Sequence, residues 1–262
     1  MKVGLQLYTV RDDMAKDFKG TLQRVKNMGY EGVEFAGLFG YAASEVKSML
    51  QEIGLQPVSA HVSIDELLAD IDKVIEDYKT IGCRYIAIPW LGEERRPGNA
   101  GFEQTIKDIF EIGEKANKRG LKLLYHNHDF EFAEVDGEYA LDILYKKIPA
   151  HLLETELDTC WVNVAGQDPA MYIRKYSGRA PVIHLKDFVM PGKKPDKMYE
   201  LIGAAQAEQN GQVDAFEFRP VGHGYQNFPA ILEAAVGAGT EWVIVELDRS
   251  GMNKSPMECA EM

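Results

Sequence analysis

The sequence predicts an α/β protein, a single-domain (β/α)8 TIM barrel that covers residues 1–262. Eight short apolar runs recur along the chain, stretches with helical periodicity separate them, and 262 residues match the size of one such barrel. A doubly wound open sheet is the competing architecture. No G-x-G-x-x-G motif follows the first run, which disfavours its dinucleotide-binding version.

The eight apolar runs have the length and composition of short buried strands. Their first residues are spaced by about 25 to 37 positions, the length of one strand plus one crossover helix. Only the last gap, of about 60, is longer and leaves room for an inserted loop. Runs that are apolar almost throughout are typical of a parallel sheet covered on both faces. In chain order they are KVGLQL (2–7), GVEFAG (32–37), PVSAHV (57–62), YIAIPW (85–90), KLLYHNH (122–128), LLETELD (152–158), PVIHLKD (181–187) and WVIVELD (242–248).

The stretches between these runs have helical periodicity with recognisable starts and stops. In SIDELLADIDKVIEDYKTIG, Ser63 and Glu66 have the spacing of a capping box, and apolar residues recur at helical intervals. The segment SPMECAEM has the pattern of the start of a terminal helix. A glycine in left-handed conformation commonly stops a helix and turns the chain. Six glycines stand just before predicted strands, where we expect them to do this: Gly29, Gly54, Gly82, Gly120, Gly178 and Gly239.

The composition favours a small-molecule ligand over nucleic acid or a membrane. With 29 Lys plus Arg against 41 Asp plus Glu, the formal charge is −12, which repels phosphate backbones and anionic membrane surfaces. The three cysteines show no C-x-x-C spacing, so we expect free thiols in a reducing cytoplasm. The N-terminal apolar stretch is too short for a signal peptide, and no run reaches the roughly 18 apolar residues of a membrane span. These observations predict a cytoplasmic protein.

Polar residues stand where the predicted strands end. The active sites of TIM barrels lie at the C-terminal ends of the strands, so these residues are the candidates for function. Taken singly, each is more often a solvated or hydrogen-bonded strand end than a ligand. Asp158, His184 and Glu246, from the sixth to eighth runs, would nevertheless point into one mouth, and carboxylate with imidazole is a common ligand set for Mn²⁺, Zn²⁺ or Mg²⁺. The full set of exit residues is Gln6, Glu34, His61, Trp90, His126, His128, Asp158, His184, Lys186 and Glu246.

At these residues the chain resembles the xylose isomerase-like TIM barrels, also called the sugar phosphate isomerase/epimerase superfamily. That group includes ketose 3-epimerases, hydroxypyruvate isomerase, inosose dehydratase and endonuclease IV. The resemblance runs nearly end to end and rests on GLQLYTVR, GYEGVEFAG, SAHVS, YHNHDFEF, ELDTCWVNVAG, VIHLKD and VELD. It implies a small-molecule sugar or keto-sugar substrate, one divalent metal ion, and a homo-oligomer, either a dimer or a tetramer. Mn²⁺ is the first choice of metal, with Mg²⁺, Zn²⁺ or Co²⁺ as alternatives.

The resemblance also implies a ligand set, with one departure. The family holds its metal with an acidic residue from strand five and with an Asp, a His and a Glu that match Asp158, His184 and Glu246 here. Many relatives read L-E-N-H at strand five, and this places His126 where their glutamate stands. In ketose 3-epimerases, the metal-bound glutamates of strands five and eight resemble a pair of bases that exchange protons with the substrate, so the strand-five glutamate is needed there. We therefore expect His126 to bind the metal and His128, on the same face, either to bind it as well or to act as acid or base.

Further roles follow for four strand-end residues. Glu246 is the expected metal ligand and base. Lys186, two residues past His184, is expected to stabilise an oxyanion or to donate a proton to a leaving hydroxyl. The competing interpretation of Lys186 is a surface lysine that balances the charge of Asp187. By resemblance, Glu34 and His61 line the pocket, as hydroxyl contacts or as a second base. A structural hydrogen-bond role is the competing interpretation of Glu34.

Aromatic and loop residues complete the predicted site. Tyr8, Trp90 and Trp161 are candidates for an apolar platform on which a sugar ring stacks, although packing is the more common role of such residues. Residues 187–225 have the composition of a loop over the mouth, from which His223 would reach the substrate. Glu131 is expected to pair with a neighbouring basic residue. No glycine-rich phosphate loop or arginine pair is evident, so phosphate recognition is not predicted.

These observations predict a metal-dependent sugar isomerase or epimerase that transfers a proton α to a carbonyl. The alternative is a lyase on the same kind of substrate, which dehydrates an inosose-like ketone or eliminates the aglycone of a 3-keto-glycoside. Endonuclease IV-like DNA repair is less favoured because of the −12 charge and the count of only six histidines. Non-catalytic sugar binding is also less favoured.

Overall fold

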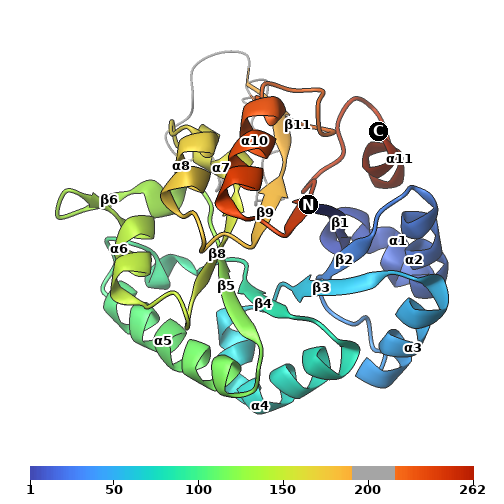
Figure 1. The fold of residues 1–262 in the computed structure, drawn as a ribbon, viewed down its shortest axis with the longest axis horizontal. Coiled ribbons are helices and arrows are strands. Elements are labelled where there is room, and N and C mark those ends of the chain that lie inside the picture. Colours follow the sequence, from blue (N-terminus) through green and yellow to red (C-terminus); the bar gives the residue numbers. More distant parts are fainter. Residues whose placement is uncertain (191–215) are drawn as a thin grey trace.

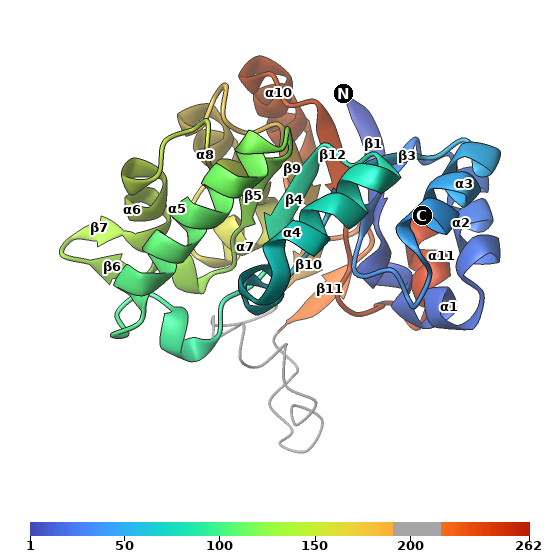
Figure 2. The ribbon, with the colours of Figure 1, turned by 90° about the horizontal axis from the view of Figure 1, so that it is seen from below.

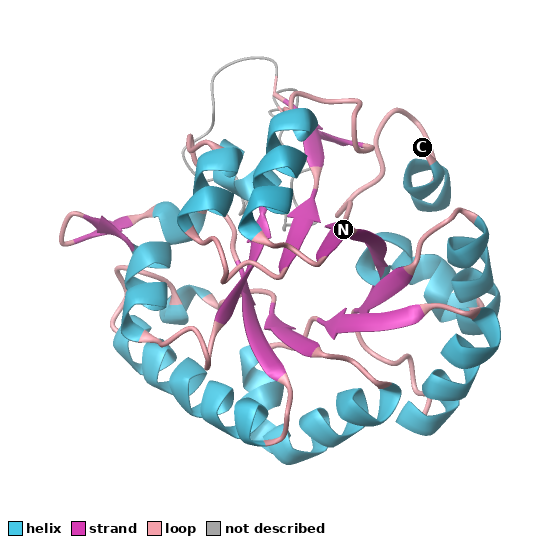
Figure 3. Cartoon of the chain, in the orientation of Figure 1, coloured by secondary structure: helices cyan, strands magenta, loops and turns pink. Residues whose placement is uncertain are grey.

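Eight parallel strands form a nearly closed barrel in the computed structural model, which describes residues 1–190 and 216–262. The sheet order is β3-β2-β1-β12-β9-β8-β5-β4, and a parallel bridge between His61 and Ala87 joins its two edges. Figure 3 shows the strands at the centre of a single domain. Each predicted run contains one strand, which confirms the TIM barrel. The strands are β1 (Lys2–Gln6), β2 (Gly32–Phe35), β3 (Gln56–Ala60), β4 (Tyr85–Ile88), β5 (Lys122–His126), β8 (Glu154–Asp158), β9 (Val182–Leu185) and β12 (Trp242–Val245).

The helices surround these strands (Figure 1). The hydroxyl of Ser63 caps α4 by accepting a hydrogen bond from the Glu66 backbone N–H, and Gly82 ends this helix with φ of +107°. All six glycines predicted to stop helices have positive φ. The predicted terminal helix is also present, and Ser255 caps its first turn. The described helices are α1 (Arg11–Lys16), α2 (Phe18–Asn27), α3 (Ala43–Ile53), α4 (Ile64–Ile81), α5 (Phe102–Lys118), α6 (Ala140–Lys147), α7 (Thr159–Val164), α8 (Pro169–Lys175), α10 (Phe228–Ala238) and α11 (Pro256–Glu261).

The interior of the barrel changes from apolar to polar along the strands. Side chains two apart on a strand share a face, so Val182 and His184 on β9 point the same way, as do Ile244 and Glu246 at β12. The apolar members belong to a small buried cluster that also contains Val58, Tyr85 and Trp242. Gly32 lets this cluster close, because a Cβ there would lie 2.7 Å from Val58 Cγ2 and 2.8 Å from a Trp242 ring atom. The polar side chains, His184 and Glu246, follow at the C-terminal ends of these strands.

Two short antiparallel ribbons are added to the barrel. One pairs β6 (Glu134–Val135) with β7 (Glu138–Tyr139), and the other pairs β10 (Asp187–Val189) with β11 (Glu217–Arg219). Figure 2 shows β10 and β11 toward the end of the barrel opposite the N-terminus. The prediction of a loop for 187–225 was therefore wrong for β10 and β11, where backbone pairing fixes both segments. The remainder of the prediction falls largely on 191–215, which lie outside the described residues. Among the described helices, none combines the length and the apolar character that crossing a membrane requires.

Candidate metal and substrate site

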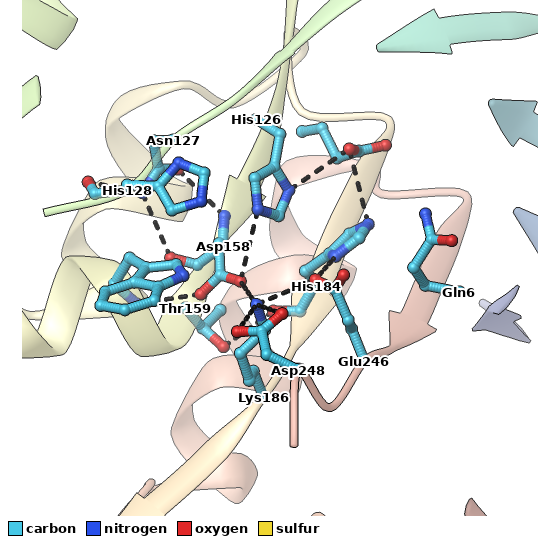
Figure 4. A network of polar contacts seen from close by, with 12 residues as sticks. Gln6, His126, Asn127, His128, Asp158, Thr159, His184, Lys186, Glu246 and Asp248 are labelled. Atoms are coloured by element: carbon cyan, nitrogen blue, oxygen red, sulfur yellow. Dashed lines mark hydrogen bonds and ion pairs between the residues drawn. The ribbon is translucent and has the colours of Figure 1, made fainter. Parts of the chain in front are cut away.

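Four side chains from neighbouring strands converge at the C-terminal end of the barrel. His126, Asp158, His184 and Glu246 place one potential ligand atom each within 4.8 Å of one another, and all four are buried. They are the four residues for which the sequence predicted metal binding, and we call them the Asp158 set. Figure 4 shows how His126 and His184 face the carboxylates of this set.

Backbone contacts fix the orientation of Asp158. Its Oδ1 accepts a hydrogen bond of 2.9 Å from the Trp161 N–H and so caps α7, while the side chain of Asn127 accepts one of 3.0 Å from the Asp158 N–H. These bonds leave Oδ2 directed at the site, 3.7 Å from His126 Nε2. On the other side of the set, Glu246 Oε2 lies 3.0 Å from His184 Nδ1. The strand ends thus hold two imidazoles against two carboxylates.

Lys186 places a positive charge within this cluster. Its Nζ lies 3.2 Å from Asp158 Oδ2, 2.9 Å from Glu246 Oε2 and 3.0 Å from Asp248 Oδ2 (Figure 4). Burial alone would lower the pKa of Lys186, but Asp158, Asp248 and Glu246 outweigh it and raise the pKa well above its usual value. The ammonium therefore persists although the side chain is only 1% exposed. The competing interpretation of Lys186 as a surface lysine is wrong.

A second group of side chains shares two histidines with the Asp158 set. His61, His126, Glu156 and His184 also bring one potential ligand atom each within 4.8 Å of one another, and we call them the Glu156 set. Glu34 lies behind it, where its Oε2 is 2.7 Å from His184 Nε2 and accepts a hydrogen bond of 2.8 Å from the Gln6 amide. Burial would raise the pKa of Glu34, but His61 and His184 outweigh it and lower the pKa to about 2. An ionised Glu34 therefore holds the His184 ring in place.

The Asp158 set fits a divalent cation. Two imidazoles and two carboxylates form a donor set that Mn²⁺, Zn²⁺ and Co²⁺ all accept. Asp158 Oδ2 is buried and makes no hydrogen bond in the described part of the chain, where Lys186 Nζ lies 3.2 Å from it. A cation would offset the cost of burying these carboxylates together.

Metal binding to this set should depend on pH. Burial alone would lower the pKa of His184, but Glu34, Glu156 and Glu246 outweigh it and raise the pKa well above its usual value. In the metal-free protein His184 thus carries a proton that a metal ion must displace. Because one proton is released for each ion bound, we expect affinity to rise about tenfold per pH unit below that pKa. Titration of the chelator-treated protein with Mn²⁺ from about pH 5.5 to 7.5 measures this slope, and a flat profile would contradict the assignment.

A cavity of about 640 Å³ opens beside the cluster. Tyr8 and Trp90, which are 42% and 40% exposed, line it and remain the candidates for a stacking platform. Arg11 and Arg249 line the same cavity, and no sequence motif indicated these two positive charges there. The polar lining comes from both sets and their neighbours: His61, His126, His128, Lys186, Glu246 and Asp248.

Three other predicted residues lie elsewhere. Trp161 is fully buried and packs beside His128, with ring centroids 5.4 Å apart, so it does not offer a face to a ligand. His223 is exposed and is not among the described residues that line the cavity. Glu131 accepts hydrogen bonds from the Tyr125 hydroxyl, at 2.5 Å, and from the His128 N–H, at 2.7 Å. The expectation that Glu131 pairs with a basic residue was wrong, because Glu131 instead fixes the backbone of His128.

Two acidic residues of the site were missed in the sequence analysis. Glu156 lies two positions before Asp158 and Asp248 lies two positions after Glu246, so each shares the face of a predicted ligand. Strand exits alone did not identify them, because Glu156 lies inside β8 and Asp248 lies beyond the end of β12. Period-two alternation along ETELD and VELD would have found both.

The fold and the site together define a TIM-barrel protein with a candidate metal centre at the C-terminal ends of its strands. The family model described as "Xylose isomerase-like TIM barrel" matches residues 22–260, so the chain belongs to that family.

Named relatives of this chain are enzymes. The inosose dehydratase of Clostridium tetani (strain Massachusetts / E88) is 27% identical over 166 residues, which cover 61% of this chain and 51% of that protein. The chain thus spans about half the length of the first curated relatives that it matches. Among solved structures, a sugar phosphate isomerase/epimerase from Parabacteroides distasonis ATCC 8503 has a TM-score of 0.79 at 20% identity, covering 99% of this chain and 95% of that one. The IOLI protein with a binding zinc atom has a TM-score of 0.74 at 16% identity, covering 100% and 94%. These structures show the shared fold.

Proposed function

We propose that this chain is a divalent-metal-dependent enzyme that moves a proton α to the carbonyl of a sugar or keto-sugar, and so interconverts isomers or epimers. The observation that carries the proposal is the Asp158 set, four buried ligand groups beside a cavity of about 640 Å³. A bound cation supplies Lewis-acid polarisation of the substrate carbonyl. The zinc atom named for the IOLI structure supports a metal in this fold, and we propose Mn²⁺ for this chain.

Glu246 is the residue best placed to hold the abstracted proton. Its side chain lines the cavity, and its Oε2 contacts both Lys186 and His184. Burial would raise the pKa of Glu246, but those two neighbours outweigh it and lower the pKa well below its usual value. The carboxylate is therefore ionised at neutral pH, the protonation state that a base must have, while the lowered pKa reduces its strength as a base.

His128 is the second candidate for proton transfer. It lines the same cavity, and burial together with Lys186 lowers its pKa well below the usual value. Its ring is thus neutral near pH 7, and a neutral imidazole can accept a proton through one nitrogen and donate one through the other. An isomerisation would be completed by return of the proton from Glu246 to the neighbouring carbon, with His128 passing the hydroxyl proton from one substrate oxygen to the other.

A lyase is the second candidate function, and Lys186 favours it. In this reaction the α-proton moves to Glu246, the bond from the β-carbon to its oxygen breaks, and Lys186 donates a proton to the departing oxygen. The products are an α,β-unsaturated ketone and water or an alcohol. The dehydratase activity named for curated relatives supports this alternative.

Solvent deuterium separates the two functions. We would incubate the Mn²⁺-loaded protein in heavy water with ketoses, inososes and 3-keto-glycosides, and follow each by NMR and ultraviolet absorption. An isomerase or epimerase incorporates deuterium with no loss of a group, whereas a lyase forms an enone chromophore. Absence of both reactions across the panel would contradict the proposed function.

A further inference from the structure

We infer that the Glu156 set is a second metal site, an alternative to the Asp158 set that selects zinc-like cations. An ion bound there takes His126 and His184 away from the Asp158 set. The position of the ion in this protein would then depend on which metal is present.

One carboxylate oxygen lies at the centre of the Glu156 set. Glu156 Oε2 is 2.7 Å from His61 Nε2, 3.4 Å from His126 Nδ1 and 3.5 Å from His184 Nε2. His61 and His126 thus approach this oxygen from the end of β3 and from β5, and His184 Nε2 on β9, whose nearer partner is Glu34 Oε2 at 2.7 Å, completes the set. The rings of His61 and His184 are stacked, with centroids 5.3 Å apart.

The same place contains buried polar atoms that lack hydrogen bonds. In the described residues, His126 Nδ1, Glu156 Oε1 and Glu34 Oε1 make none. His126 is 2% exposed and both glutamates are fully buried. Such orphaned atoms are uncommon in folded proteins, and a bound ion is one of the explanations for them. A cation would pair with both carboxylates and with this nitrogen of His126.

The two sets use opposite nitrogens of the rings that they share. His126 directs Nδ1 at Glu156 and Nε2 at Asp158. His184 has Nδ1 at Glu246 and Nε2 between Glu34, at 2.7 Å, and Glu156, at 3.5 Å. A neutral imidazole has one lone pair to give and keeps a proton on its other nitrogen. One ion at a time is therefore the expected occupancy.

The donor atoms of the two sets favour different metals. The Glu156 set offers three imidazoles and one carboxylate, the softer combination, which suits Zn²⁺ and Co²⁺. The Asp158 set offers two carboxylates and two imidazoles, which suits the harder Mn²⁺. Zinc in the Glu156 set would compete with manganese through the shared histidines.

Each set has residues of its own, which makes the inference testable. His61 belongs to the Glu156 set alone and Asp158 to the other alone. We would strip the full-length protein with a chelator and titrate Zn²⁺ and Mn²⁺ into wild type, His61→Ala and Asp158→Asn, using calorimetry. We expect His61→Ala to weaken zinc binding by about 10- to 100-fold and to leave manganese within about twofold, and Asp158→Asn to do the reverse. The exposed His151 provides the matched control, His151→Ala, which should change neither affinity.

Two results would overturn the inference. Loss of zinc affinity in Asp158→Asn but not in His61→Ala would place zinc in the Asp158 set, and two zinc ions bound per chain would exclude competition for shared rings. If His61→Ala fails to fold, Glu156→Gln removes a ligand of the same set while retaining the shape of the side chain. Because metal binding is the readout, the test stands whether or not the proposed sugar chemistry is found.

Discussion

Replacing Glu246 with glutamine is expected to reduce turnover by about 10²- to 10⁴-fold, the usual contribution of a general base. The amide keeps the shape of the side chain but loses the charge that Lys186 and His184 contact at 2.9 and 3.0 Å. It also removes a ligand of the Asp158 set, so Mn²⁺ affinity should fall as well. Steady-state kinetics at saturating metal keep the site filled, so the loss of turnover that remains there is due to the missing base and not to the weaker metal binding.

A matched substitution controls for the change from glutamate to glutamine. Glu233 is exposed on α10, and Glu233→Gln should retain wild-type kinetics and metal content. If Glu246→Gln retained both as well, Glu246 would be neither base nor ligand. The proposed chemistry would then need another carboxylate, with Asp248 the nearest alternative at the cavity.

Most of the fold could be predicted because its signals are local. Each strand is a short apolar run, and each glycine stop depends on one residue and its φ, as at Gly82. The pairing of β10 with β11 was missed because it joins residues about thirty positions apart, across 191–215, and no local pattern specifies such a partner.

The residues of the Asp158 set could be predicted from the sequence, whereas Glu156 and Asp248 were missed and the contacts within the site could not be predicted. His126, Asp158, His184 and Glu246 were identified by their positions at the C-terminal ends of predicted strands, because these ends all lie at the same end of a parallel barrel. Which nitrogen of a ring faces which carboxylate depends on side-chain rotamers and on the stagger between strands. The division into two sets that share His126 and His184 therefore emerged only from the structure.

Replacing Lys186 with methionine should destabilise the metal-free protein by about 3–5 kcal/mol, the usual cost of removing one partner from a buried ion pair. The substitution keeps the length of the side chain but leaves Asp158, Glu246 and Asp248 without the ammonium within 3.2 Å of each. The folded-state pKa of Lys186 is raised, so its contribution is fully present at pH 7 and is lost only as the pH rises through that value. Urea denaturation at pH 7 in the presence of a chelator measures the loss.

Added metal should restore part of this stability. A cation that binds the folded state at 100 times its Kd adds about 2.7 kcal/mol, and here it would also replace the missing positive charge. Lys146→Met is the control, because Lys146 and its partner Glu138 are exposed on the surface and should matter little to stability. If Lys186→Met unfolded at the same urea concentration as Lys146→Met in chelator, Lys186 would not be needed to stabilise the buried carboxylates in the folded protein. Restoration by Mn²⁺ in Lys186→Met but not in the double variant with Asp158→Asn would place the cation among these carboxylates.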